Sequence, residues 1–241
     1  MIVILRWNIE HNINMEQKLI DSIKILRENK FYRIADLFYM TGNRWEQDRN
    51  EILTNPAYKD TILYDYLTQK ESDKDFSLFR NIARQHSTKY SEQPKATELV
   101  FHLRLGDAFD PNGKDRVNNR IQWAHNQYKV FFRRNRVMLE AYNEVTVVTA
   151  MHFGPDELTG NYYYSDECYN ESIKFLNYFS KRLNDFGCKI NIISNENIDE
   201  DICYIIRAKH FVPGMSKFST LLADCIQDDA KLYREPIQKY I

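Results

Sequence analysis

The stretch Val100-Phe101-His102-Leu103-Arg104-Leu105-Gly106-Asp107 predicts a strand that carries a histidine and an arginine on one of its two faces. The opposite face takes the alternating apolar residues Leu99, Phe101, Leu103 and Leu105. A central strand of a parallel sheet is normally apolar on both faces, so His102 and Arg104 indicate an anionic or hydrogen-bonding occupant. An internal salt bridge from Arg104 is the alternative. Gly106 ends the strand without a side chain, and Asp107 adds a carboxylate at its rim.

Length and composition are those of an ordinary soluble globular protein. The 241 residues suffice for one large or two small domains, and we expect two. A net charge of -1 gives no basic field to attract nucleic acid. The cysteines lack metal-ligand spacing, which predicts reduced, mostly buried thiols; they are Cys168, Cys188, Cys203 and Cys225. The apolar run at residues 2–5 is too short for a signal segment or a membrane span, so we expect a cytoplasmic protein without a membrane span.

The first part of the chain predicts a mainly helical lobe around one or two strands. A strand is expected at Ile2–Trp7 and a helix from about Met15 to Asn29. Asn55 before Pro56 is a helix-start signal, because proline suits the first helical position. The polar segment from Ser87 to Thr97 has no apolar period, which places a boundary there. We therefore expect lobes at residues 1–95 and 96–241.

From Leu99 onward, strands and helices alternate as in a doubly wound parallel sheet. The expected strands are residues 99–105, 145–150, 188–194 and 210–212. The expected helices are residues 118–142, 166–186 and 198–208, with a last one that begins near Ser216. The apolar stripe expected on the helix at 166–186 is Ile173, Leu176, Phe179 and Leu183, and Gly187 marks its end. This half predicts a Rossmann-like lobe.

Polar residues cluster just after each of these strands, where the ligand crevice of an open parallel sheet lies. The clusters are Arg104 to Asp107, His152, Ser194 to Asn197, and Ser216 to Ser219. Their convergence on one edge favours a binding site, which no single cluster would establish.

The chemistry of these clusters suits a nucleotide diphosphate. Arg104 can form a bidentate contact to phosphate and stabilise the charge on a departing nucleotide. Ser216 and Ser219 lie at a helix start, where amide groups and the helix dipole attract phosphate, although simple N-capping by Ser216 is equally compatible. Glu196, after Asn195, can accept from N1–H and the exocyclic amine of guanine. A solvated loop acid is the other interpretation of Glu196.

Three segments together resemble the superfamily of α1,2-, α1,6- and protein O-fucosyltransferases. His102 to Asp107 resembles its His-x-Arg-x-Gly-Asp motif, Ser194 to Asn197 its acidic turn, and Pro213 to Ser219 its Ser-x-Phe-Ser element at a helix start. The resemblance covers about residues 98–230. It implies a GT-B-like fold of two Rossmann-like lobes with a reduced N-terminal lobe, and an inverting, metal-independent transfer that needs no cofactor beyond a GDP-sugar donor and a glycan acceptor.

The resemblance also implies roles for individual residues. Arg104 would contact the β-phosphate, His102 would position the nucleotide, and Glu196 with Asn195 would bind the base. The diphosphate would lie against Gly106 and the element that contains Ser216, Phe218 and Ser219.

The chain departs from the family pattern at several places. Leu105 stands where many members have a second arginine, Asn195-Glu196 replaces the usual Asp-Asp, and no glycine occurs before Gly42 to form the family's first glycine loop. These departures keep three alternatives open: the same scaffold with another nucleotide sugar, for example a xylosyltransferase, a non-catalytic nucleotide- or glycan-binding module, and a structural interaction domain.

The general base and the acceptor side have several candidates. Asp107 is the first choice for the base, with Asp110 and Asp115 in the same loop, because one carboxylate within reach of the acceptor hydroxyl suffices. Capping of the Gly106 turn is the alternative role of Asp107. Asp110, His152 and Tyr163, in the run Tyr162 to Tyr164, are acceptor-side candidates. The basic cluster Arg133, Arg134 and Arg136 is interpreted as a solvated helix face.

Overall fold

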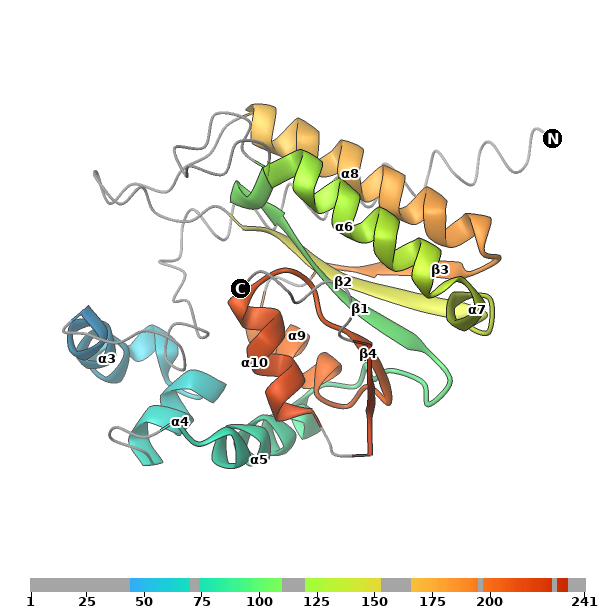
Figure 1. Cartoon of the computed structure of the whole chain (residues 1–241). Helices are drawn as coiled ribbons and strands as arrows, with labels where there is room; N and C mark the ends of the chain where they lie inside the picture. The colour runs from blue at the N-terminus through green and yellow to red at the C-terminus, as the bar shows by residue number, and fades with distance from the viewer. Residues whose placement is uncertain are drawn as a thin grey trace. The chain divides into compact units, whose positions relative to one another are not determined.

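The computed structural model describes residues 44–69, 74–109, 120–152, 166–194, 197–226 and 229–233. The strand expected at Ile2–Trp7 and the helix expected after Met15 lie outside these ranges. The described part is an α/β structure with a five-stranded parallel sheet in the order β3-β2-β1-β4-β5 (Figure 1). The strands are β1 (Leu99–Gly106), β2 (Glu144–His152), β3 (Lys189–Ile193), β4 (His210–Val212) and β5 (Lys231–Leu232). The predicted alternation of strands and helices is thereby confirmed at the level of a Rossmann-like sheet.

The helices agree with the sequence pattern, apart from a few boundaries. They are α3 (Arg44–Thr54), α4 (Ile62–Gln69), α5 (Phe76–His86), α6 (Arg120–Arg134), α7 (Arg136–Leu139), α8 (Asp166–Asp185), α9 (Ile198–Ile205) and α10 (Lys217–Cys225). Short 3-10 turns are η1 (Pro56–Tyr58), η2 (Ser87–Lys89) and η3 (Asp107–Phe109). No helix within the described ranges has the length and hydropathy needed to cross a membrane.

The helix expected from Pro56 is wrong in its extent. Asn55 does cap a helical turn, since its Oδ1 accepts from the Ala57 amide at 3.0 Å, but that turn is η1 alone. Asp60 has a φ of +69°, a left-handed conformation that no helix continues through. A separate helix, α4, therefore begins at Ile62.

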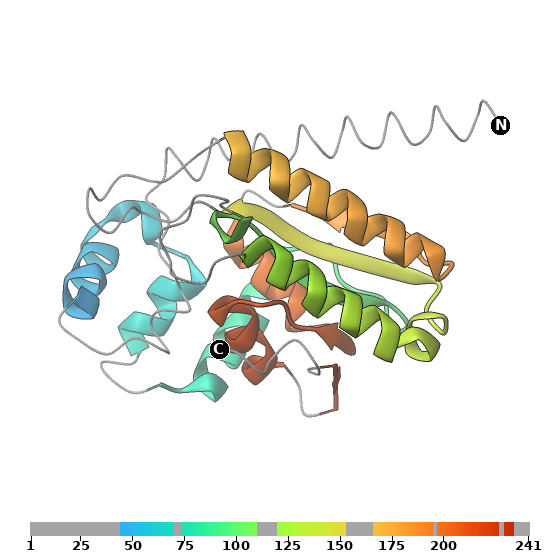
Figure 2. The ribbon, with the colours of Figure 1, turned by 45° about the horizontal axis from the view of Figure 1, so that its top comes forward.

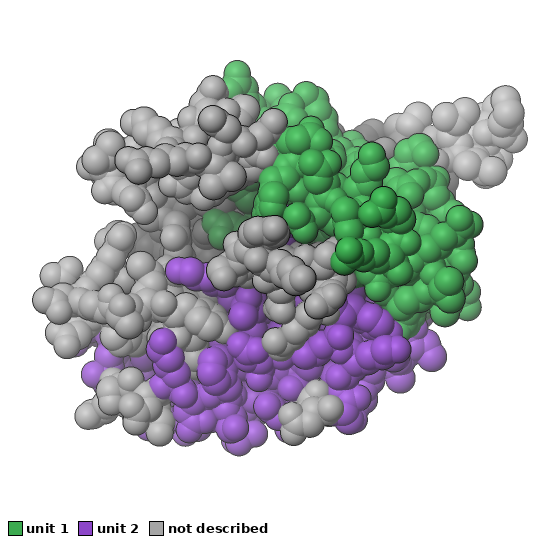
Figure 3. All heavy atoms as spheres, in the orientation of Figure 1, with its two compact units in different colours: residues 1–30, 103–196 green, residues 31–102, 197–241 purple. Residues whose placement is uncertain are grey.

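The chain forms two compact units, coloured separately in Figure 3. Unit 1 comprises residues 1–30 and 103–196, and unit 2 comprises residues 31–102 and 197–241. Each unit combines two separate stretches of chain. The division into lobes at residues 1–95 and 96–241 stays a prediction.

In unit 1, α6 and α8 run side by side along β2, as Figures 1 and 2 show from two directions. Aromatic rings fill the space between the two helices: Tyr128 meets Phe179 edge-on at 5.2 Å between ring centroids, and Phe109 lies 4.6 Å from Phe175. Burying such rings is a main source of stability in a core of this kind. The buried face of α8 is shifted from the predicted stripe, because Ser172 and Phe175 are buried where Ile173 is half-buried.

The long helix expected at residues 118–142 is interrupted. α6 ends at Arg134 and α7 begins at Arg136, with Asn135 at a non-helical φ of -106° and ψ of 20°. The amide of the Asn135 side chain donates to the Phe131 carbonyl at 3.0 Å. The Asn135 backbone N–H donates to the same carbonyl at 2.9 Å, so the break lies in the backbone conformation of Asn135 and not in a lost hydrogen bond.

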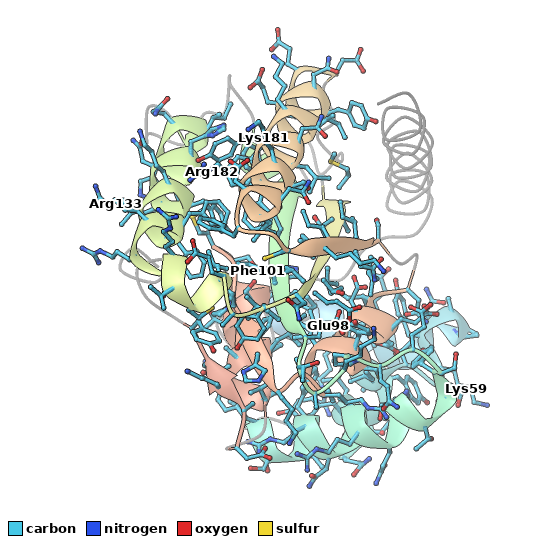
Figure 4. The ribbon with its side chains drawn as sticks, turned by 90° about the vertical axis from the view of Figure 1, so that its right-hand side faces the viewer. Lys59, Glu98, Phe101, Arg133, Lys181 and Arg182 are labelled. Carbon is cyan, nitrogen blue, oxygen red and sulfur yellow. The ribbon has the colours of Figure 1, made fainter. Side chains whose placement is uncertain are left out.

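In unit 2, α5 packs against α4, α9 and α10. The first half of β1 pairs with β4, with Leu99 opposite His210 and Phe101 opposite Val212. Phe101 is buried on β1 (Figure 4). The chain before β1 is tied to α9, because the Tyr204 hydroxyl donates to Glu98 Oε1 at 3.1 Å.

The prediction for the thiols is confirmed. The four cysteines are free and buried: Cys168, Cys188, Cys203 and Cys225. Burial raises the pKa of Cys203 and of Cys225 to about 12 each, so neither thiol ionises readily.

Candidate functional site

The His102 side chain of β1 contacts the start of α10 within unit 2. Its Nδ1 is hydrogen-bonded to Ser219 Oγ, and its ring meets the Phe218 ring edge-on at 5.1 Å between centroids. His102 is only 9% exposed, so its polar atoms need partners inside the protein. The sequence predicts a hydrogen-bonding group opposite the polar face of this strand. At His102, that group belongs to α10.

Ser216 is the N-cap of α10, with an extended backbone at φ -149° and ψ 153°. Its Oγ accepts from the Ser219 amide at 3.0 Å and donates to Ser219 Oγ at 3.1 Å. The predicted capping role of Ser216 is thereby confirmed. Ser219 is fully buried and Ser216 is 5% exposed, so both hydroxyls act inside the protein, where they order the first turn of the helix.

Gly214 allows the loop before α10 to lie directly against β1. A Cβ at this position would overlap the carbonyl oxygen of His102, and it would also lie 3.3 Å from Ser219 Oγ. The neighbour is backbone, which cannot rotate away as the end of a side chain would. Only glycine permits this approach, and the Pro213-Gly214 pair in the sequence indicates a turn without revealing that requirement.

The second half of the motif at residues 100–107 lies in unit 1. Arg104 is half-buried, and Gly106 ends β1 with a φ of +86°, which bears out the need for glycine there. The Gly106 amide donates to the buried Ser172 hydroxyl of α8 at 2.9 Å. Thr149 of β2 donates its hydroxyl to the Leu103 carbonyl at 2.6 Å. Sequence reasoning missed Ser172 and Thr149, because a single hydroxyl on an apolar face gives no distinct signal.

Several candidates lie outside the described residues. They are Asp110, Asp115, Tyr162, Tyr163, Tyr164, Asn195 and Glu196. Asp107 begins η3 and His152 ends β2, but the side chains of these two residues lie outside the described part of the chain. Their proposed roles stay predictions. Among the described residues, no three histidine, cysteine, aspartate or glutamate side chains are grouped as metal ligands.

Asn197 anchors the chain that follows the acidic turn. As N-cap of α9 it accepts from the Asp199 amide at 2.9 Å through Oδ1, and its Nδ2 donates to the Tyr90 hydroxyl at 3.2 Å. Asparagine before the acidic run at residues 199–201 is an N-terminal helix signal that could have identified this cap from sequence. Burial, and then the negative charge of Asp199, raise the pKa of Tyr90 to about 12.

A second polar cluster in unit 2 connects α4, α5 and α9. Asp199 is 3% exposed, and its Oδ2 accepts from the Ile62 amide at the start of α4 at 2.9 Å. Burial raises the pKa of Asp199, which the Ile62 amide and the charges of His86 and Lys89 partly oppose. His86 Nε2 lies 2.6 Å from Asp65 Oδ2. These two contacts fix α9 and α5 to α4.

Comparisons of this chain with protein-family models, with curated proteins and with solved structures return no match. The resemblance to fucosyltransferases therefore stays a prediction from the sequence motifs.

Proposed function

We propose that this chain is an inverting, metal-independent glycosyltransferase that moves a sugar, L-fucose from GDP-fucose in the first instance, onto a glycan hydroxyl. In this proposal the Rossmann-like sheet belongs to a GT-B-like arrangement with a reduced N-terminal lobe. The observation that carries the proposal is the hydrogen bond between His102 and Ser219. It joins the strand motif to the helix-start motif across 117 residues of sequence.

The chemistry of the helix start supports a diphosphate ligand. The first amide groups of a helix such as α10 have no acceptor within the helix, and the helix dipole adds a partial positive charge there. Both features favour a phosphate. Arg104, two residues after His102 on the same face of β1, would neutralise the charge that develops on the leaving GDP.

The remaining roles follow from the sequence motifs. The acceptor hydroxyl attacks the anomeric carbon from the face opposite the diphosphate, which inverts the configuration, while Asp107 takes the hydroxyl proton. Glu196 with Asn195 would bind guanine and thereby select GDP over UDP. Asp110, His152 and Tyr163 are the acceptor-side candidates.

The decisive experiment is a thermal-shift panel of GDP, UDP, ADP and CMP with their sugar conjugates, first without metal and then with manganese. A ligand that binds the folded state raises the melting temperature once its concentration exceeds Kd. We expect a metal-independent shift with GDP and GDP-fucose, followed by transfer of fucose to a glycan acceptor. A shift with UDP alone would indicate another sugar donor, and a flat panel at millimolar ligand would overturn the proposal. Binding without transfer would indicate a binding module.

A pair of arginine variants tests the proposed phosphate contact. Arg104→Ala removes a charge-assisted hydrogen bond, so we expect about a 10- to 100-fold increase in the Kd for GDP. Arg133→Ala is the matched control, because Arg133 is an exposed arginine on α6 whose side chain points away from the helix (Figure 4). Equal affinity of the two variants would exclude Arg104 from the binding site.

A further inference from the structure

Positive charge is concentrated near the carboxyl ends of the helices in unit 1. Between Arg120 and Leu139, α6 and α7 contain five arginine or lysine residues and no aspartate or glutamate. Lys181 and Arg182, near the end of α8, add two further cations. The whole chain has a net charge of -1, so this concentration of charge is local.

The cations of α6 and α8 lie close together because the two helices share an aromatic contact. Arg182 lies over the Phe186 ring at 5.5 Å from its centroid, and this ring is 5.9 Å from the Phe132 ring of α6. Arg133 follows Phe132 directly, and Figure 4 shows Arg133, Lys181 and Arg182 on these neighbouring helices. The region is called the basic surface below, and it comprises Lys129, Arg133, Arg134, Arg136, Val137, Lys181 and Arg182.

Carboxylates neutralise only part of the charge on the basic surface. Arg136 pairs with Glu140, and Asp185 accepts from both Lys181 and Arg182. Within the described part of the chain, three exposed cations of this surface form no ion pair: Lys129, Arg133 and Arg134. Six cations against two carboxylates leave the basic surface with a net charge of +4.

The helix itself does not account for all of these residues. Cations in the last turn of a helix interact favourably with its dipole, which is reason enough for Arg133 and Arg134. Lys129 lies four positions before Arg133, however, where like charges repel. Val137 is 82% exposed, and it is the one large apolar side chain that is exposed among the described residues. Natural sequences break such local rules mainly at functional sites.

We propose that the basic surface binds the anionic headgroups of a phospholipid membrane, with Val137 at the level of the headgroups. Charge complementarity requires an anionic partner. An exposed valine among arginines favours a partner that is apolar directly beneath its charged groups, as a bilayer is. Nucleic acid is the weaker candidate, because a net charge of -1 provides no long-range attraction for it.

The basic surface and Arg104 lie at opposite edges of the sheet in unit 1. The Cys188 thiol, directly before β3, donates to the Leu139 carbonyl at the end of α7 at 3.6 Å, so α7 ends near the amino-terminal edge of the sheet. Arg104 lies near the carboxyl end of β1. Membrane binding and the proposed nucleotide binding therefore use different residues, and the membrane proposal does not rest on the proposed function.

The test is co-sedimentation of the full chain with lipid vesicles. We expect binding to vesicles of equal parts phosphatidylserine and phosphatidylcholine, and none to pure phosphatidylcholine. Binding should be lost between about 0.1 M and about 1 M salt, because the screening length falls from about 10 Å to about 3 Å. Equal sedimentation with the two kinds of vesicle overturns the proposal. Binding to a DNA oligonucleotide without binding to the mixed vesicles overturns it in favour of nucleic acid.

Two matched double variants locate the surface. A basic residue near an anionic membrane contributes a factor of about five, so Arg133→Gln with Arg134→Gln should lower the partition coefficient about 25-fold. The control is Lys59→Gln with Lys74→Gln, which removes two exposed lysines of unit 2 and the same total charge. Equal partition coefficients for the two double variants overturn the assignment to this surface.

Val137→Ser tests the apolar contact separately. Because valine and serine are both uncharged, we expect the partition coefficient to fall about 3- to 10-fold and its salt dependence to stay the same. An unchanged partition coefficient overturns the role of Val137.

The membrane proposal and the proposed function fail separately. If the chain binds mixed vesicles and none of the nucleotides, the proposed function is wrong and the basic surface stands. If it binds GDP and no vesicles, the membrane proposal is wrong and the nucleotide site stands.

Discussion

Replacing Gly214 with alanine should destabilise the protein through a backbone collision. The new Cβ would overlap the His102 carbonyl oxygen, so the loop before α10 must move away from β1. Forcing an extra carbon into a packed interior costs about 1–3 kcal/mol. Displacement of the loop would also weaken the hydrogen bond between His102 and Ser219, worth about 1 kcal/mol. We therefore expect the free energy of unfolding to fall by about 2–4 kcal/mol.

Urea unfolding followed by tryptophan fluorescence measures this loss. A pure change in stability lowers the midpoint concentration and leaves the slope unchanged. In a protein of this size, a loss of about 2–4 kcal/mol lowers Tm by roughly 4–16 °C.

Gly187 provides the matched control, because it is constrained by its own backbone conformation, whereas Gly214 is constrained by a neighbouring strand. It follows α8 with a φ of +84°, and a Cβ there would have no heavy atom within 4 Å. Gly187→Ala should cost about 1–2 kcal/mol from backbone strain alone, and asparagine, which tolerates left-handed φ, should recover part of it. Gly214→Asn should recover nothing. A Gly214→Ala variant within about 0.5 kcal/mol of the wild type would refute the close approach to β1.

Three other substitutions or treatments have defined outcomes. The pKa of Asp199 is raised by burial, so the fold gains stability from this group below the ordinary aspartate pKa of about 4 and loses it as the pH rises through the folded-state value. Asp199→Asn should remove that downward slope from the unfolding free energy measured against pH; an unchanged slope contradicts this. Ellman's reagent should react with the four thiols only after denaturation, because all four are buried and the pKa values of Cys203 and Cys225 are raised to about 12. One thiol that reacts rapidly in the native protein would contradict this prediction. Ser172→Ala leaves the Gly106 amide without its hydroxyl acceptor and should lower the free energy of unfolding in urea by about 1–3 kcal/mol. An unchanged free energy of unfolding would show that this hydrogen bond does not stabilise the fold.

The sheet and its helices were predictable because apolar periodicity and local stop signals coincide in the second half of the chain. The strand that contains His102, the end of α8 at Gly187 and the N-cap of α10 at Ser216 all follow from residues close in sequence. The break at Asn135 and the restart at Ile62 were missed. Both depend on single backbone conformations that average propensities do not reveal.

The sequence predicts which residues belong to the candidate site, but it does not predict the hydrogen bonds between them. The motif spacing indicates that His102 and Ser219 belong to one site, but their direct hydrogen bond depends on how α10 packs against β1. The same packing makes Gly214 indispensable. Ser172 could not be singled out either, because its partner is a backbone amide distant in sequence.

The strand order has a consequence for how the chain is made. β1, at the centre of the sheet, has β2 as one neighbour and β4 as the other, and β4 begins only at His210. During synthesis, one edge of β1, rich in leucine and phenylalanine, therefore stays unpaired until the ribosome has made the chain as far as β4. An exposed apolar strand edge is a template for association with other chains. Aggregation of nascent or truncated chains should accordingly be greatest for products that end between β1 and β4.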